Sequence, residues 1–114
     1  MLRYFFILLC ILTTSAKAQN VKIIGSNYIF ENAPFSACHA STLVELGEGK
    51  IMAAWFGGKH EGDKGVTIWT AIKTGKKWSA PKPVADGIIN DSTRFACWNP
   101  ALFKAIDGTL TLHY

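Results

Sequence analysis

The sequence predicts an all-β protein assembled from a repeated unit of short strands. Three observations lead to this fold class. Apolar runs rich in β-branched and aromatic residues alternate with turn residues along the chain after its first 18 residues. None of these runs has the helical period of about 3.6 that an amphipathic helix requires. Finally, the pattern restarts later in the chain at a constant offset, which brings Cys38 onto Cys97.

We expect four strands in the first unit. The turn Gly47-Glu48-Gly49 joins the first two strands, because glycine adopts positive φ angles without a steric penalty. Gly75 marks the turn before the fourth strand. Pro81 and Pro83 put that strand at an edge, since proline lacks the backbone donor of a strand ladder. The expected strands cover residues 41–46, 50–56, 66–73 and 78–84.

The offset from Cys38 to Cys97, which we call the repeat offset, also aligns a second strand-turn-strand unit with the first. It superimposes Ala37-Cys38 on Ala96-Cys97, Leu43 on Leu102, Gly49 on Gly108, Ile51 on Leu110, and Trp55 on Tyr114. A repeat of four strands is typical of a β-propeller blade. One blade cannot bury both of its faces, so neighbouring blades must stack. The chain is therefore expected to hold about one and a half blades of a larger propeller, to lack the remaining blades, and to aggregate on its own.

The first 18 residues are typical of a secretory signal peptide. Arg3 supplies the positive charge, residues 4–12 form an apolar core, and Ala16-Lys17-Ala18 is a small-x-small cleavage site. The apolar core is too short to span about 30 Å of hydrocarbon. We therefore predict a secreted or periplasmic protein that begins at Gln19 and has no membrane span after cleavage.

The residues after the leader exclude several functional classes. Arg3 and Lys17 are two of the 12 basic residues, which leaves 10 basic against 8 acidic residues and no run of lysine or arginine. This mild charge argues against nucleic acid as a partner. Two cysteines remain, and in an exported protein they permit a disulfide between Cys38 and Cys97. No metal or cofactor is predicted, because the spacing of His60, Glu61 and Asp63 matches no diagnostic metal motif.

Five motifs follow one another along the chain: Cys38-His39-Ala40-Ser41-Thr42-Leu43, Ala53-Ala54-Trp55-Phe56-Gly57-Gly58 followed by His60-Glu61-Gly62, Ile68-Trp69, Trp78-Ser79-Ala80-Pro81, and Cys97-Trp98-Asn99-Pro100-Ala101-Leu102-Phe103. In this order they resemble the BNR-repeat, sialidase-like family of exo-sialidases. The resemblance covers about residues 34–114 and corresponds to the N-terminal part of the family. It implies a six-bladed β-propeller that acts on glycans. It also implies an arginine cluster for a sugar carboxylate, an aspartate acid/base, and a tyrosine nucleophile with a glutamate partner.

The chain departs from the pattern of this family at three places. The stretch from Phe35 to His39 has no arginine, where sialidases usually carry one, and His39 stands in that neighbourhood. Gly65 occupies a position where relatives often have aspartate. The structural Asp-box is degenerate, because residues 71–78 keep only Gly75 and Trp78. These departures leave the acid/base residue open between Glu61 and Asp63.

The candidate catalytic residues are His39, Glu61 and Asp63. Histidine is a frequent general acid or base, which suits His39 to acid or base catalysis, although a buried structural histidine is the alternative. Glu61 and Asp63 lie in a glycine-rich loop after a strand, where catalytic groups are frequent, although an ordinary solvated loop has the same composition.

The candidate substrate-binding residues are Arg94, Trp98 and Asn99. Arg94 can hold a carboxylate through paired hydrogen bonds, or it is a surface residue in a loose ion pair. Trp98 can stack on a sugar ring beside the hydroxyl partner Asn99, or it belongs to the core of the blade. Three other tryptophans, Trp55, Trp69 and Trp78, are expected to pack between blades.

The leading hypothesis is an exported glycoside hydrolase that removes a terminal acidic sugar, with sialic acid as the default. Such cleavage needs an acid for the leaving group and a nucleophile or base opposite it. One alternative is a lyase or hydrolase for uronate-containing polysaccharide with His39 as the catalyst. Another is a propeller that binds carbohydrate without turnover. In every case the partner is a glycan or polysaccharide, and we expect residues 19–114 to have no activity alone.

Overall fold

A computed structural model of the chain describes residues 20–114, which form nine β-strands and, within that range, no helix. The predicted leader, residues 1–18, therefore lies outside the described residues. The search of the described part for a helix long and apolar enough to cross a membrane finds none. All strand pairs are antiparallel, so the prediction of an all-β protein is confirmed. The strands are β1 (Ala37–Gly47), β2 (Lys50–Gly58), β3 (Thr67–Thr74), β4 (Lys77–Trp78), β5 (Lys82–Ala85), β6 (Ile88–Asn90), β7 (Thr93–Arg94), β8 (Ala101–Lys104) and β9 (Leu110–His113).

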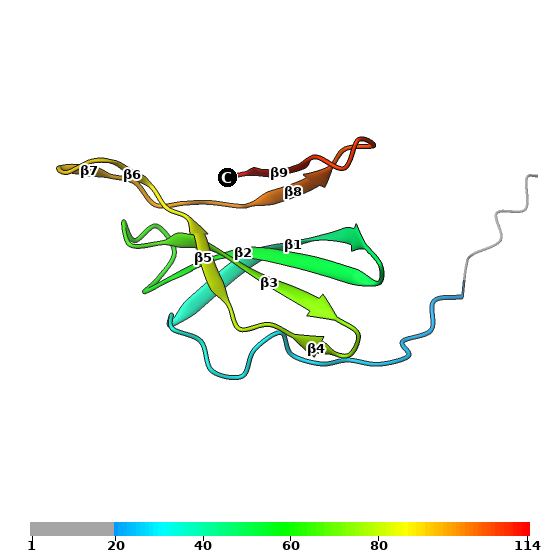
Figure 1. Cartoon of the computed structure of the whole chain (residues 1–114). Helices are drawn as coiled ribbons and strands as arrows, with labels where there is room; N and C mark the ends of the chain where they lie inside the picture. The colour runs from blue at the N-terminus through cyan, green and yellow to red at the C-terminus, as the bar shows by residue number, and fades with distance from the viewer. Residues whose placement is uncertain (1–19) are drawn as a thin grey trace, which may run out of the picture.

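The first sheet grows from the hairpin of β1 and β2 and has the order β1-β2-β3-β4, with β5 also paired to β3 (Figure 1). Glu48 and Gly49 connect β1 to β2, and both have positive φ angles, of 53° and 69°. Two consecutive residues of this kind form the tight turn whose twist matches that of the flanking strands. The hairpin predicted at Gly47-Glu48-Gly49 is therefore confirmed.

The predicted fourth strand is split into two short pieces. β4 and β5 both pair with β3, and they are separated by residues 79–81. Ser79 bridges the break, because its backbone N–H donates to Ile72 O over 2.9 Å and its hydroxyl accepts from Ile72 N over 3.0 Å. Pro83 lies opposite Trp69 in β5, which pairs with β3 alone among the described strands. The edge position expected from the prolines is confirmed, but the continuous strand is not.

The hairpin of β8 and β9 repeats the register of β1 and β2. Leu43 pairs with Ala53 in the first hairpin, and Leu102 pairs with Leu112 in the second, so both partners move by the repeat offset. The other three pairs of β8 and β9 obey the same offset. The second hairpin lies against the first sheet, where Lys104 Nζ donates to Leu46 O over 2.7 Å (Figure 1). The repeat predicted from the sequence is therefore present in the strand pairing.

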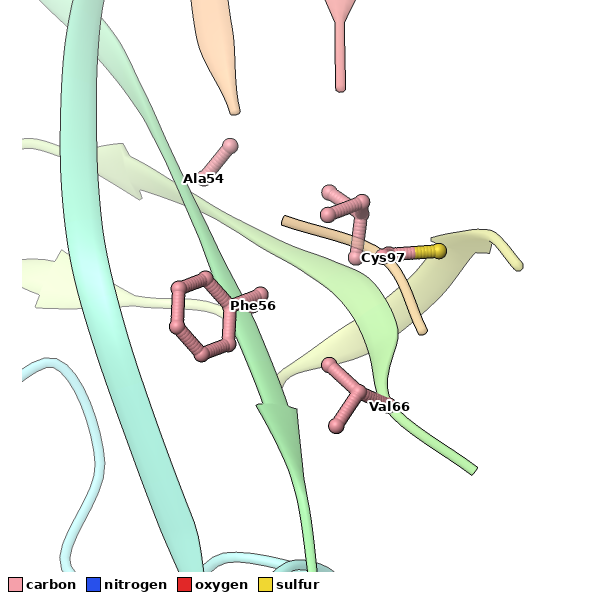
Figure 2. Packing of buried hydrophobic residues seen from close by; sticks show 5 residues of the cluster. Ala54, Phe56, Val66 and Cys97 are labelled. Carbon is pink, nitrogen blue, oxygen red and sulfur yellow. The ribbon is translucent and has the colours of Figure 1, made fainter. Parts of the chain in front are cut away.

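One face of the first sheet packs against the second hairpin. Its buried residues are Ala54, Phe56, Val66 and Ile68, joined by Cys97 from the connection to β8. Leu102 and Leu112 of the second hairpin cover this cluster (Figure 2 shows Ala54, Phe56, Val66 and Cys97). We call this the second-repeat face. It buries apolar surface between successive repeat units, as stacked repeats require.

The opposite face of the first sheet is covered by the N-terminal segment, residues 29–35. Ile29, Phe30 and Phe35 pack on a cluster built from Ala53, Trp55 and Ala71, with Trp69 and Trp78 at its margin. Phe30 and Phe35 lie 5.3 and 6.4 Å from Trp55 between ring centroids. We call this the N-terminal face. Within the described residues, a segment of the same chain packs on the three tryptophans, so their packing between blades stays a prediction.

The two cysteines of the described part are free thiols. Cys38 is exposed near the start of β1, whereas Cys97 is buried on the second-repeat face. Burial raises the pKa of the Cys97 thiol; the charge of Asp86 raises it further, and the charge of Arg94 opposes the rise. The disulfide that the sequence permits is not formed in this structure. A thiol that is buried and less acidic behaves as a small apolar core residue.

Candidate functional site

The candidate site residues gather at one end of the two repeats. Ala37 at the start of β1 lies opposite Gly58 at the end of β2, and the loop to β3 opens at the same end. β5 also ends there, since Ala85 pairs with Ile68 near the start of β3. The connection from β5 to β8 is tied to this end by the bond from Cys97 N to Val66 O, 3.3 Å long. We call this end, with residues 37–40, 59–65 and 94–99, the loop end.

His39 lies at an irregular point of β1. Its ring is exposed and stands 5.6 Å, between centroids, from Phe56 on the neighbouring strand. A bulge follows between His39 and Thr42, and Ala40 within it has a φ of 53°. Alanine rarely occupies this left-handed region, and bulges next to functional sites re-aim side chains. The alternative of a buried structural histidine is wrong, because His39 is open to solvent.

Trp98 extends the row of rings that starts at His39. Its ring lies 6.2 Å from that of Phe56, in an edge-to-face arrangement, and half of the residue is exposed. Phe56 is 2% exposed, so His39 and Trp98 flank a buried ring. Asn99 is exposed beside Trp98. An exposed aromatic face next to a polar amide can stack on a sugar ring and bond its hydroxyls.

The loop between β2 and β3 is held by its own polar groups. Asp63 Oδ1 accepts from Gly65 N over 2.7 Å, and Asp63 Oδ2 lies 3.7 Å from His60 Nε2. His60 Nδ1 in turn contacts Glu61 O at 3.1 Å. Glu61 itself is exposed. Asp63 therefore shapes the loop, while the side chain of Glu61 is open to solvent.

Gly65 is explained by this loop geometry. A Cβ atom at Gly65 would lie 2.8 Å from Asp63 Oδ1, inside the normal contact distance. A larger residue there would push away the carboxylate that accepts from the backbone of residue 65. The glycine and Asp63 thus act as a pair, and an aspartate at position 65 would not fit beside Asp63 as the loop stands. The same loop meets Trp98, since a Cβ atom at Gly62 would lie 3.9 Å from Trp98 Cη2.

Arg94 belongs to the hairpin of β6 and β7, where it pairs with Ile88. The hairpin projects beyond the first sheet (Figure 1). Arg94 is half-buried, and its Nε atom is buried without a hydrogen-bond partner among the described residues. The alternative of a loosely paired surface arginine therefore does not describe it. The Nε atom is shielded from solvent, so a carboxylate would have to be bound by the terminal nitrogens of the guanidinium.

Two hollows flank the loop end. One has a volume of about 360 Å³ and is lined by His39, Ser41, Cys38 and Trp55 together with Tyr28 and Phe30. The other has a volume of about 350 Å³ and contains Lys59, Asp63 and Ser36 above Trp69. Both volumes suit a small ligand. His39 and Asp63 thus line hollows, whereas Glu61, Trp98 and Asn99 are exposed on the surface.

Sequence reasoning missed three features of the loop end. Phe56 links His39 to Trp98, but its apolar character predicts only a core position. Ala40 carries the strained bulge, and no residue type at this place signals a positive φ angle. Lys59 gives the second hollow a positive charge. Its position directly after Gly58, at the end of an expected strand, could have indicated that it lies at the loop end. Within the described residues, no group of three His, Cys, Asp or Glu side chains is arranged to hold a metal ion.

Comparison with known proteins supports the resemblance seen in the motifs. The model of the BNR repeat-like domain matches residues 49–114, which is more than half of the chain. The match runs from the turn of the first hairpin through the whole second hairpin. Neither the curated proteins nor the solved structures gave a match. The repeated hairpin and the family model agree, and the chain belongs to the BNR repeat-like family.

Proposed function

We propose that this chain forms the first blade and half of the second in an exported, sialidase-like β-propeller. In this proposal the full propeller hydrolyses a terminal acidic sugar, such as sialic acid, from a glycan. The gathering of His39, Glu61, Trp98 and Asn99 at the loop end is the observation that carries the proposal. Membership of the BNR repeat-like family supports the propeller. The remaining blades would supply the strand that β9 lacks and the missing parts of the active site.

Each residue receives a role that follows from its surroundings. Trp98 stacks on the sugar ring, and Asn99 bonds its hydroxyl groups. Glu61 is the general acid that protonates the leaving oxygen, because Asp63 is already engaged with the backbone of Gly65 and with His60. Arg94 is half-buried and meets the sugar carboxylate through the terminal nitrogens of its guanidinium.

The second candidate is a lyase for uronate-containing polysaccharide. Its support is that His39 directly precedes the bulge at Ala40 and is among the residues that line a hollow of about 360 Å³. In that reaction His39 removes the proton next to the uronate carboxylate, and the glycosidic oxygen leaves as a double bond forms. The product absorbs ultraviolet light, whereas the product of hydrolysis does not.

Glycan binding tests the shared part of both candidates. We expect the full-length propeller to bind sialyl-lactose or a glucuronate oligosaccharide more tightly than lactose, measured by tryptophan fluorescence. Trp98→Ala should weaken this binding about tenfold, because loss of about 1.4 kcal/mol of stacking corresponds to that factor. Phe103→Ala is the matched control, since Phe103 is also exposed but lies within β8. Equal binding of all three sugars would contradict both candidates.

Turnover by the full-length propeller separates the candidates. Release of a fluorogenic sialoside that is lost in Glu61→Gln and kept in His39→Ala supports hydrolysis. A new ultraviolet absorbance that is lost in His39→Ala supports the lyase. Selective binding of acidic glycans with neither reaction, unaltered by either substitution, would show that the protein binds carbohydrate without turnover.

A further inference from the structure

One hollow at the loop end has no role in the reaction proposed above. It has a volume of about 350 Å³ and is lined by residues 34–36 and by the loop that follows β2. Its lining includes the ring of Trp69 and the polar side chains of Ser36, Lys59 and Asp63, and we call it the Lys59 hollow. Sites for small ligands combine an apolar or aromatic lining with a few polar groups that fix the orientation of the ligand. The hollow has this composition.

The aromatic wall of the Lys59 hollow is held in place. Trp69 Nε1 donates to Gly57 O over 3.1 Å, and the ring of Phe35 lies 4.9 Å from that of Trp69 between centroids. Glycine at position 57 permits this packing, since a Cβ atom there would lie 3.1 Å from Phe35 Cγ. Trp69 is half-buried, so part of its surface is open to solvent. A ring that is already fixed can stack on a sugar with little further loss of freedom.

The polar groups of the hollow keep free bonding capacity. Among the hydrogen bonds and ion pairs of residues 20–114, none uses the side-chain atoms Lys59 Nζ or Ser36 Oγ. Asp63 Oδ1 accepts from Gly65 N, but a carboxylate has further acceptor sites on both of its oxygens. The hollow therefore offers a donor, an acceptor and a hydroxyl that can be either, which is the mixture that bonds the hydroxyl groups of a sugar.

The charges of the hollow favour a neutral ligand. Among its lining residues, Lys59 is the one cation and Asp63 the one anion, so the formal charges balance. An acidic group placed there would meet the carboxylate of Asp63 as a like charge. Hydroxyl groups meet no such conflict, because they accept from Lys59 and donate to Asp63. A neutral sugar therefore suits the hollow better than an acidic one.

The hollow and Trp98 lie on either side of the loop between β2 and β3. Asp63 lines the hollow, whereas a Cβ atom at the preceding Gly62 would lie 3.9 Å from Trp98 Cη2. Trp69 packs at the margin of the N-terminal face, and Trp98 contacts Phe56 of the second-repeat face. A ligand that touches both sides crosses the end of a single sheet, and sheet layers are about 10 Å apart. Two linked sugar rings suit this distance, and a single ring does not.

We propose that the Lys59 hollow binds the neutral sugar to which the terminal acidic sugar is linked. Trp69 stacks on this neutral sugar, while Lys59 and Asp63 bond its hydroxyl groups. The inference rests on the proposed function, which assigns the acidic sugar to Trp98, and it adds a substrate preference. The protein recognises the acidic sugar together with its neighbour, and it binds a glycan more tightly than the same acidic sugar linked to a small alcohol.

Calorimetric titration of the full-length propeller tests this preference. The Glu61→Gln background is used so that hydrolysis does not consume the ligand, and the ligands are sialyl-lactose, methyl sialoside and lactose. We expect sialyl-lactose to bind about tenfold more tightly than methyl sialoside. Lys59→Met should remove this advantage and leave the affinity for methyl sialoside unchanged, because loss of one hydrogen bond from a charged donor corresponds to about that factor. Lys64→Met is the matched control, since Lys64 is exposed in the same loop but does not line the hollow.

The outcomes separate the neutral-sugar site from the proposed function. Equal affinities for sialyl-lactose and methyl sialoside, both above that for lactose, would overturn the site and leave the proposed function in place. An equal loss for both sialosides in Lys59→Met, or the same loss in Lys64→Met, would overturn the site as well. If lactose binds as tightly as sialyl-lactose and Lys59→Met weakens both, the site is supported and the preference for an acidic sugar is wrong. If none of the three ligands binds, both proposals are overturned.

Discussion

The two hairpins of this chain have the same strand register, but their residues are buried to different extents. Trp55 of β2 is 3% exposed, whereas Tyr114, its equivalent in the second repeat, is 58% exposed. Trp55 is covered by the N-terminal segment and flanked by β3, while Tyr114 follows β9, which among the described strands pairs with β8 alone. The difference teaches that strand pairing is encoded locally in each repeat, but burial depends on the neighbour that each repeat receives.

The contacts between the hairpins are also specific to their places. Lys104 Nζ donates to Leu46 O, and Leu102 N donates to Thr42 Oγ1 over 3.4 Å. The equivalent of Lys104 is Glu45, which has no proton to donate, and the equivalent of Thr42 is Ala101, which has no hydroxyl. A second copy stacked in the same way on β8 and β9 would lack both of these hydrogen bonds.

The largest contrast should come from truncating the equivalent aromatic residues. Trp55→Ala is expected to lower the free energy of unfolding by about 3–5 kcal/mol, because it empties the cluster beneath Phe30 and Phe35. Tyr114→Ala should change the free energy by no more than about 0.5 kcal/mol, since its ring is mostly solvated. Denaturant unfolding of both variants measures the contrast. Equal losses would show that the second hairpin is buried as well as the first.

A smaller contrast is expected at Lys104. Lys104→Met should lower the free energy of unfolding by about 1–3 kcal/mol, because the bond from a charged donor is lost and Leu46 O is left without it. Glu45→Met at the equivalent position is the control and should stay within about 0.5 kcal/mol. Thermal unfolding compares the two. A matching loss in Glu45→Met would assign the effect to the added side chain and not to the bond.

The smallest contrast concerns pH and the turn of the second hairpin. Asp107 accepts from Thr109 N over 2.9 Å, and this bond holds the pKa of Asp107 below its ordinary value. The stabilisation is therefore complete above the ordinary value of about 4 and is lost as pH falls through the lower pKa of the folded state. Asp107→Asn keeps an acceptor but does not titrate.

We expect the unfolding temperature of the unaltered chain to fall toward or below that of Asp107→Asn as the solution is acidified from about pH 5 to below the ordinary pKa of about 4. If the difference in unfolding temperature between the two chains stays constant over this pH range, the bond from Thr109 N to Asp107 does not contribute to the pH dependence of stability.

The strands and turns could be predicted from residue types, because they depend on the local alternation of apolar runs and turn residues. The runs at residues 50–56 and 66–73 became β2 and β3, and the glycines at 49 and 108 became turn residues with positive φ. The expected strand at residues 78–84 failed because Ser79 satisfies the backbone of Ile72 with its own hydroxyl and interrupts the ladder. Competition between a side chain and the ladder leaves no periodic signal.

The candidate site was readable in part. His39, Trp98 and the acidic loop were selected as polar or aromatic residues near expected strand ends, and antiparallel pairing brings those ends together. The role of Asp63 within its own loop was not readable, since it depends on the distance to Gly65 N and His60. The half-buried state of Arg94 follows from the separate hairpin of β6 and β7, which carries no motif.

By itself, the sequence determined the all-β class, the repeated hairpin and the resemblance to a family, because each depends on the order of residues close together along the chain. Tertiary structure decided which face of the first sheet each neighbour covers, and therefore which tryptophans are buried. It also decided the row of rings from His39 through Phe56 to Trp98, which joins residues from both repeats. The physical reason is that burial and ring contacts depend on distances across the fold, whereas strand alternation depends on successive residues along the chain.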